Sequence, residues 1–371
     1  MPDFHLAAIG NAYKPWSPDK GATSTERTTP MASIFCGIDF HKRTSTIFAT
    51  DGEGRKIESV TIQSDKLRQY LSNRRDWKIA IEASGGVHHI VSGLLEDGHE
   101  VVMINPNQFR GIAIGGIKTD DRDAVALAHA LRVGFVPTVH HKSIGARRLS
   151  SLLVSREIVV RTRVGIVNHV RATLREYGLL INAGCEAFDS QVENRIAKLD
   201  FVPIQNTLRS LVGQVRILKA EETRMEQALK ELTREDLRVK HLQSIPGVGP
   251  MTSYAMIAVT DDISRFKDAN QFTAYLGLVP SVTASGDKRM MGSITRSGSE
   301  MLRRYFVHGA RAWMRYSPEK GDRNRIWAEQ VKGRRGMNKS VVALARRMAR
   351  IAFAVMRDGS TYRESVKNKA A

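Results

Sequence analysis

The sequence has little of several residue types, and each scarcity excludes a class of protein. Its 371 residues include only two cysteines, Cys36 and Cys185, which are too few for a disulfide framework or a cysteine-rich zinc site. No apolar run approaches the roughly 18 residues of a membrane span, and no apolar signal core stands near residue 1. We therefore expect a reduced, cytoplasmic protein with no membrane partner.

Negative charge and aromatic residues are also in short supply. The chain carries 57 Lys and Arg against 38 Asp and Glu, a formal net charge of +19. A surplus of that size concerns partners rather than fold, and nucleic acid is the usual polyanion, with an anionic membrane surface as the competitor. Aromatic residues make up 6%, too few for base stacking to be the main mode of binding. The composition therefore predicts a protein that holds nucleic-acid backbones.

Composition and periodicity divide the chain into five segments. Residues 1–32 are polar, contain several prolines and show no periodicity, and they are predicted to form a disordered leader. Residues 33–144 alternate strands with helices, 145–238 have a helical pattern, 239–360 are mostly helical with glycine-rich loops, and a tail follows at 361–371. The sequence thus predicts an α/β domain followed by all-α regions.

The α/β segment opens with three strands in a row. SIFCGIDF, TSTIFAT and RKIESVTIQ have strand patterns, and the turn DGEG separates the last two. Two further strands, in WKIAIEASGG and HEVVMINP, alternate with helices. A meander followed by parallel crossovers indicates an α/β layer arrangement, and the order is that of ribonuclease H-like (RuvC-like) folds.

The helical segment carries a heptad seam. Its apolar positions alternate spacings of three and four, with Glu222 in the one polar slot, which predicts a coiled coil or a long helical hairpin. The seam comprises Leu208, Leu211, Val215, Leu218, Met225, Leu229 and Leu232. The earlier arm repeats the seven-residue spacing at Leu153, Val160, Val167 and Leu174. We interpret its arginines as an outer face suited to a phosphate backbone: Arg147, Arg148, Arg156, Arg161, Arg163 and Arg171.

Two acids follow apolar residues at strand ends. Asp39 ends the first strand in CGIDFHK, and Glu82 ends the fourth in AIEASGG. In a ribonuclease H-like sheet these strands are parallel neighbours, so both carboxylates are expected at the same edge. An acid placed in an apolar strand is costly unless it is paired or bound to a cation. A turn or a salt bridge is the alternative for each acid alone.

The stretch KTDDRDAVALA adds further acids at a predicted helix start. Thr119 suits the N-cap, whereas Asp120 and Asp123 are three residues apart and share a helix face. Asp121 points away from that face, and we expect it to be replaceable. Four carboxylates without His or Cys favour Mg²⁺ or Mn²⁺, and a pair of such ions can stabilise both oxygens of a phosphodiester transfer.

The C-terminal segment begins with LQSIPGVGPMTSYAMIA, which predicts a helix-hairpin-helix. Its glycines, Gly247 and Gly249, allow backbone N–H groups to meet a phosphate oxygen; a structural turn is the alternative. Serines follow among basic residues, and spacing selects no nucleophile among them. The serines are Ser281, Ser285, Ser293, Ser297 and Ser299, and the basic residues, predicted to bind nucleic acid, are Lys288, Arg289, Arg296, Arg303 and Arg304.

Several motifs in one order resemble a known family. GIDFHK, IEASGG, INPNQ, KTDDRDA, IPGVGP and RFKDANQFTAYLGLVP are similar to those of the DEDD transposases of insertion sequence one-ten, the bridge-RNA-guided recombinases, over about residues 33 to 360. The resemblance implies a RuvC-like domain, a coiled-coil insertion and a C-terminal transposase domain. It carries the catalytic metal-binding acids over to Asp39, Glu82, Asp120 and Asp123, and the serine nucleophile to Ser285.

The same resemblance implies partners and a setting. These are double-stranded DNA at the element ends and target, a structured non-coding guide RNA, and further copies of the chain in a homo-oligomer (dimer or tetramer), in a bacterial cytoplasm at the nucleoid. The polar leader departs from the family pattern, and Arg296 replaces a lysine, which leaves Ser297 and Ser299 as competing serines. Two alternatives stay open: a RuvC-like metal-dependent nuclease that uses water, and a non-catalytic nucleic-acid-binding protein.

Overall fold

A computed structural model describes residues 34–109, 120–285, 288–317 and 322–362. The description covers only the backbone at residues 107, 120–122, 283–285 and 288–289. The predicted leader and most of the predicted tail therefore lie outside the described residues. The chain forms two compact units, residues 1–142 and 143–371, and each is described by itself.

The first unit is built on a five-stranded mixed sheet. Its strand order is β3-β2-β1-β4-β5, with β1, β2 and β3 antiparallel and β1, β4 and β5 parallel. The predicted meander followed by crossovers is confirmed, and the arrangement is consistent with a DEDD nuclease-like domain. The strands are β1 (Ile34–Phe40), β2 (Thr44–Thr50), β3 (Lys56–Gln63), β4 (Trp77–Glu82) and β5 (Glu100–Ile104).

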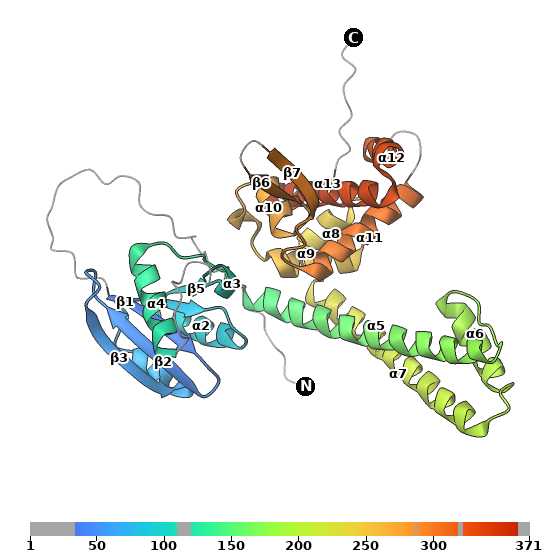
Figure 1. The fold of residues 1–371 in the computed structure, drawn as a ribbon, viewed down its shortest axis with the longest axis horizontal. Coiled ribbons are helices and arrows are strands. Elements are labelled where there is room, and N and C mark those ends of the chain that lie inside the picture. Colours follow the sequence, from blue (N-terminus) through green and yellow to red (C-terminus); the bar gives the residue numbers. More distant parts are fainter. Residues whose placement is uncertain (1–33, 110–119, 286–287, 318–321, 363–371) are drawn as a thin grey trace, which may run out of the picture. The chain divides into compact units, whose positions relative to one another are not determined.

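Helices cover both faces of this sheet. One face packs Ile38 and Ile81 against Leu67, Val91 and Leu94. The helices here are α1 (Leu67–Leu71), which follows a 3₁₀ turn at Ser64–Lys66, and α2 (Val87–Glu96); α3 (Pro106–Phe109) follows β5. The helix α4 (Asp120–Val133) covers the other face (Figure 1).

Gly37 allows α4 to lie directly on β1. A Cβ atom at this position would stand 2.0 Å from the Ala124 carbonyl oxygen and 2.6 Å from the Ala128 backbone nitrogen. Only glycine leaves room for so close a backbone approach. The glycine of the GID motif therefore sets the height of α4 above the sheet.

The second unit begins with a long helical hairpin. The helices α5 (Ile144–Glu176) and α7 (Val202–Leu232) run side by side, with α6 (Cys185–Ile196) between them in sequence (Figure 1). Leu208, Val212 and Val215 are buried against Val170 and Leu174. Of the two predicted arrangements, the hairpin is therefore the one found, and Leu208, Val215 and Leu229 of the predicted seam are buried within the chain.

Two of the arginines assigned to an outer phosphate-binding face lie in the helix interface instead. Arg156 Nη2 donates to Glu222 Oε1 at 2.9 Å, and Arg163 Nε donates to Glu222 Oε2 at 3.0 Å. The interpretation was wrong for this pair because 156 and 163 fall on the seam that Leu153 and Val160 define. Glu222, the one polar slot of the seam, neutralises both.

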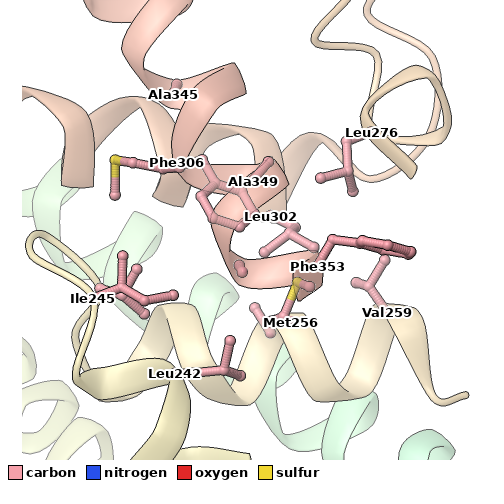
Figure 2. Close-up of a cluster of buried hydrophobic side chains, with 14 of the residues drawn as sticks. Leu242, Ile245, Met256, Val259, Leu276, Leu302, Phe306, Ala345, Ala349 and Phe353 are labelled. Atoms are coloured by element: carbon pink, nitrogen blue, oxygen red, sulfur yellow. The ribbon is translucent and has the colours of Figure 1, made fainter. Parts of the chain in front are cut away.

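The rest of the second unit is a helical body around one core. The helices α9 and α13 supply much of it, and Figure 2 shows Met256 and Phe353 from these helices packed with Leu242 and Leu302. The amphipathic basic helix α13 thus packs within its own unit. The helices are α8 (Leu237–Gln243), α9 (Pro250–Thr260), α10 (Ala269–Tyr275), α11 (Glu300–Tyr316), α12 (Arg323–Arg335) and α13 (Met337–Asp358), with a 3₁₀ turn at Ile263–Arg265.

A β-hairpin within this body was not predicted. The strands β6 (Pro280–Ser285) and β7 (Lys288–Ile294) pair antiparallel. Their glycine-rich, polar sequence gave no apolar alternation, because both faces of the ribbon are largely exposed: Met290 and Met291 are neighbours and both are exposed.

Among the helices of the described ranges, none is long and apolar enough to cross a membrane.

Candidate active site

The sheet brings Asp39 and Glu82 to adjacent positions. The strands β1 and β4 run parallel, and Ile38 stands opposite Ile81 in their register. The next residues along the two strands are Asp39 and Glu82, so both acids lie at the same carboxyl edge. Since successive side chains alternate between faces, both acids point away from the face that holds Ile38 and Ile81. That leaves them on the face covered by α4.

The direction of α4 brings its first turn toward this edge. At its C-terminal end, Arg132 Nη1 donates to the Gly52 carbonyl at 3.4 Å. Gly52 follows β2, whose last residue Thr50 pairs with Phe35 at the start of β1. The end of α4 therefore lies beside the start of β1, and its beginning lies toward Asp39. Asp123 immediately precedes the residue whose carbonyl meets Gly37.

The three described acids differ in their surroundings. Asp39 is 7% exposed, and its Oδ2 lies 3.1 Å from Nε2 of His41. Glu82 is partly buried, and among the described residues its carboxylate meets no hydrogen-bonding or ion-pairing group. A half-buried carboxylate in this state is suited to a cation. Asp123 is partly buried as well.

A complete metal site is not assembled among the side chains that the structure describes. In that part of the chain, no three His, Cys, Asp or Glu side chains are grouped to hold one ion. Asp120 is placed by its backbone alone, in the first turn of α4. Thr119 lies outside the described residues. The four-carboxylate set therefore stays a prediction, with three of its four side chains located.

His41 is a neighbour of the acids that was not predicted. It follows β1 by one residue, and its half-exposed imidazole meets Asp39. A signal was present in the sequence, because residues two apart at a strand end point to the same side. In the motif GIDFHK, the histidine is two residues after the acid.

The predicted helix-hairpin-helix region has the order α8, turn, α9, and its two glycines have different surroundings. Gly247 has φ of +79°, and a Cβ there would lie 2.2 Å from the Gly309 carbonyl oxygen of α11. Gly249 is the N-cap of α9, and a Cβ there would meet nothing within 4 Å. Gly247 therefore serves packing between helices, whereas Gly249 is open to a ligand. DNA binding by this turn stays a prediction.

The candidate serines separate by their hydrogen bonds. Ser281 Oγ donates to the Ser293 carbonyl at 3.0 Å, and Ser297 Oγ donates to the Ala274 carbonyl at 3.3 Å. Ser299 caps α11 by accepting from the Leu302 amide. Ser285 is the last residue of β6 and stands opposite Lys288 in the hairpin register, but its side chain lies outside the description.

Two of the basic candidates already hold protein groups. Arg303 Nη1 donates to the carbonyls of Leu276 and Ser297, at 3.0 and 2.8 Å, and Arg304 pairs with Glu157 of α5. Arg296 is exposed, with φ of +58°. The side chains of Lys288 and Arg289 are outside the description. Nucleic-acid binding by this set stays a prediction, which Arg296 fits better than Arg303 or Arg304.

Both units contain segments that match families of known proteins. Residues 239–325 match the transposase IS116/IS110/IS902 family, and residues 36–179 match the DEDD transposase family of IS110. The chain is 30% identical to the transposase for insertion sequence element IS1111A of Coxiella burnetii, over 88% of this chain and 90% of that protein. It is 29% identical to the "probable family 20 transposase" of Pseudomonas aeruginosa, over 88% and 98%.

Proposed function

Because the chain belongs to the IS116/IS110/IS902 family of insertion-sequence transposases, we propose that this DNA transposase cuts and rejoins DNA through a serine. The DEDD domain indicates a dependence on divalent metal ions. In our proposal the ion is Mg²⁺, with Mn²⁺ as a substitute. The proposed catalytic residues are the acids Asp39, Glu82, Asp120 and Asp123 and the nucleophile Ser285.

The observation that carries the metal proposal is the register of Asp39 and Glu82. Two acids stand side by side on the face under α4, at the end where Asp123 lies. A donor set of carboxylate oxygens alone suits a hard cation such as Mg²⁺. When bound, such ions would neutralise charge on the phosphodiester oxygens during transfer. The carboxylates of this chain fix where that charge is neutralised, and the sheet holds them in place.

The proposed covalent step uses the hydroxyl of Ser285. Its Oγ attacks the phosphorus, an Oγ–P bond forms, and the bond from phosphorus to one sugar oxygen breaks. The serine proton is lost to a base and the released sugar hydroxyl gains one, so no water is consumed. A hydroxyl of a second DNA end then attacks the phosphoserine and restores the enzyme. Support comes from three of the other four candidate serines, since Ser281, Ser297 and Ser299 are committed to structural hydrogen bonds, which leaves Ser293 as the serine to compare.

The choice of DNA sequence belongs, in this proposal, to a structured non-coding RNA. A chain with +19 net charge and 6% aromatic residues is suited to binding backbones rather than to reading bases. Several copies of the chain would act together on the two DNA partners, at the nucleoid of a bacterial cell. The folded core of this DNA-handling machinery is the helical body of the second unit, with Gly249 and Arg296 as open contacts.

The deciding experiment compares Ser285→Ala with Ser293→Ala. Ser293 is exposed on the same hairpin and its side chain makes no hydrogen bond among the described residues, so it is a matched control. With end-labelled DNA and Mg²⁺, the parent and the Ser293 variant should give a protein–DNA adduct on a denaturing gel, and the Ser285 variant should give none. If the Ser285 variant still cleaves and joins DNA as the parent does, the serine mechanism is wrong and a RuvC-like reaction with water replaces it.

A further inference from the structure

A groove in the second unit is lined by none of the residues assigned above. It is a groove of about 1030 Å³ formed by α11, α12 and the first residue of α13. Its lining includes three apolar side chains: Met314, which is buried, and Ile326 and Met337, which are 43% and 46% exposed. Such side chains in an open groove can pack against a ligand that is partly apolar.

The walls of this groove are strongly cationic. They carry Arg311, Arg315, Arg325 and Lys332 against one acid, Glu329. Lys332 pairs with Glu329 at 2.9 Å on the exposed surface of α12, an ion pair of little energetic value. No carboxylate among the described residues pairs with Arg311 or Arg315, which are exposed and lie one turn apart on α11. Among the described side chains, the groove therefore holds two guanidinium groups, those of Arg311 and Arg315, without a paired carboxylate.

An exposed aromatic ring adjoins these arginines. Tyr316 ends α11 and is 75% exposed, and the Arg315 guanidinium carbon lies 5.3 Å from its ring centroid. A cation beside a ring that is open on its other side is an arrangement that stacks nucleobases while holding phosphate. In a chain with so few aromatic residues, a solvent-exposed tyrosine at this place is informative.

We infer that this groove binds the sugar–phosphate backbone of an unpaired nucleic-acid strand, with Tyr316 stacking against one base. Arg311 and Arg315 present planar donors that match phosphate oxygens. The volume is that of a ligand pocket rather than of a cradle for a duplex, which favours a short single strand. An anionic membrane surface fits less well because Met314 is buried and offers a membrane little apolar surface. This site is independent of the acids and of Ser285.

The test measures binding of a fluorescent single-stranded oligonucleotide of mixed sequence by anisotropy, with the full chain in EDTA so that no cleavage occurs. Arg311→Gln combined with Arg315→Gln should lower affinity at least about tenfold and reduce the slope of log K against log salt by about 1.4, since each single-strand phosphate contact contributes about 0.7. Tyr316→Ala should lower affinity roughly 5- to 150-fold while leaving that slope unchanged, as expected for a lost stacking contact.

The matched control is Lys240→Gln combined with Arg350→Gln. Both residues are exposed in the same unit and neither lines the groove, so this double variant changes the net charge by the same amount as Arg311→Gln with Arg315→Gln. Its affinity for the oligonucleotide should fall less than about twofold relative to the parent. Equal losses in the two double variants would reveal a general charge effect and overturn the proposal. Unchanged oligonucleotide binding, or a loss confined to phosphatidylserine vesicles or to duplex DNA, would overturn it as well.

If the Arg311→Gln and Arg315→Gln double variant does not fold, a second, more conservative variant still tests the proposal. Arg311→Lys combined with Arg315→Lys keeps both charges, so it should keep the salt slope and lose only the affinity that planar donors add. The Ser285→Ala protein should bind the oligonucleotide as the parent does. Failure of the serine mechanism and failure of this site are therefore distinguishable in separate assays.

Discussion

The two units use their motif residues in different ways. In the first unit, Asp39 and Glu82 lie in register at one sheet edge, and the rest of the sheet holds them there. In the second unit, residues of equally suggestive motifs hold the unit itself together: Gly247 contacts α11, Arg303 contacts backbone carbonyls, and Arg156 pairs across the arm. A motif residue on a sheet edge thus has few structural duties, whereas one inside a helical body has many.

Both units nevertheless contain the same packing device. Gly37 brings α4 onto β1, and Gly247 brings the α8–α9 turn onto Gly309. In each case a side chain would meet a backbone atom closer than 3 Å. The difference is what the approach positions: acids in the first unit, and a buried core in the second. Substitutions should therefore affect chemistry in one unit and stability in the other.

The largest effect is expected from Asp39→Asn. The change keeps the shape of the side chain but removes a charge that we propose binds metal, so Mg²⁺-dependent DNA transfer should fall on the order of a thousandfold, equivalent to about 4 kcal/mol. Asp121→Asn is the control and should stay near the parent rate. Activity is measured as product formed against Mg²⁺ concentration, and thermal unfolding of the two variants should match. Equal activity of the two variants would remove the distinction between the acids.

The next largest effect is on the stability of the helical hairpin formed by α5 and α7. Glu222→Ala leaves Arg163, whose side chain is 13% exposed, without its carboxylate, while Arg156 keeps its second partner Glu226. Losing one partner of a largely buried ion network costs about 3 to 5 kcal/mol. The control is Glu221→Ala next to it, whose partner Arg224 is 67% exposed and which should cost less than about 1 kcal/mol. Hydrogen exchange of α5 and α7 amides measures both, and similar losses would contradict a buried network.

A smaller stability effect separates the two hairpin glycines. Gly247→Ala adds a methyl group at a positive φ and against the Gly309 carbonyl, which together should cost about 2 to 4 kcal/mol. Gly249→Ala has open space and should cost about 1 kcal/mol or less, the value of a lost glycine N-cap. Denaturant unfolding compares the two. If Gly247→Ala leaves stability intact and weakens only DNA binding, Gly247 belongs to the nucleic-acid interface after all.

Much of the first unit could be predicted because its information is local. Apolar runs ended by acids fixed the strands, and neighbouring parallel strands put Asp39 and Glu82 at one edge. The second unit was harder because its roles depend on contacts distant in sequence. The sequence around Gly247 does not indicate that this residue packs against Gly309. The two carbonyl oxygens that accept from Arg303 belong to residues 27 and 6 positions earlier in the chain. Arg156 could have been assigned correctly, since its heptad position was already in the pattern.

His99 is a first-unit residue to which we assign no role in the chemistry, so its expected effect is on stability. It is buried immediately before β5, and neither ring nitrogen has a hydrogen-bond partner among the described residues. Burial lowers its pKa from the usual 6.5, which Asp97 opposes and Arg75 reinforces. As pH falls below 6.5, the unfolded chain therefore takes up a proton before the folded chain does, and stability declines until the pH passes the lowered folded pKa.

The expected effect is small and confined to the first unit. Hydrogen exchange of β4 and β5 amides should become faster between pH 7.5 and 5.5, after correction for intrinsic exchange rates, while α9 amides of the second unit change less. His99→Leu should abolish this pH dependence and leave stability at pH 7.5 equal or higher, because an apolar side chain needs no hydrogen bond. His169→Gln, at an exposed arm position, should leave it intact. Persistence of the pH effect in His99→Leu would assign the effect to another group.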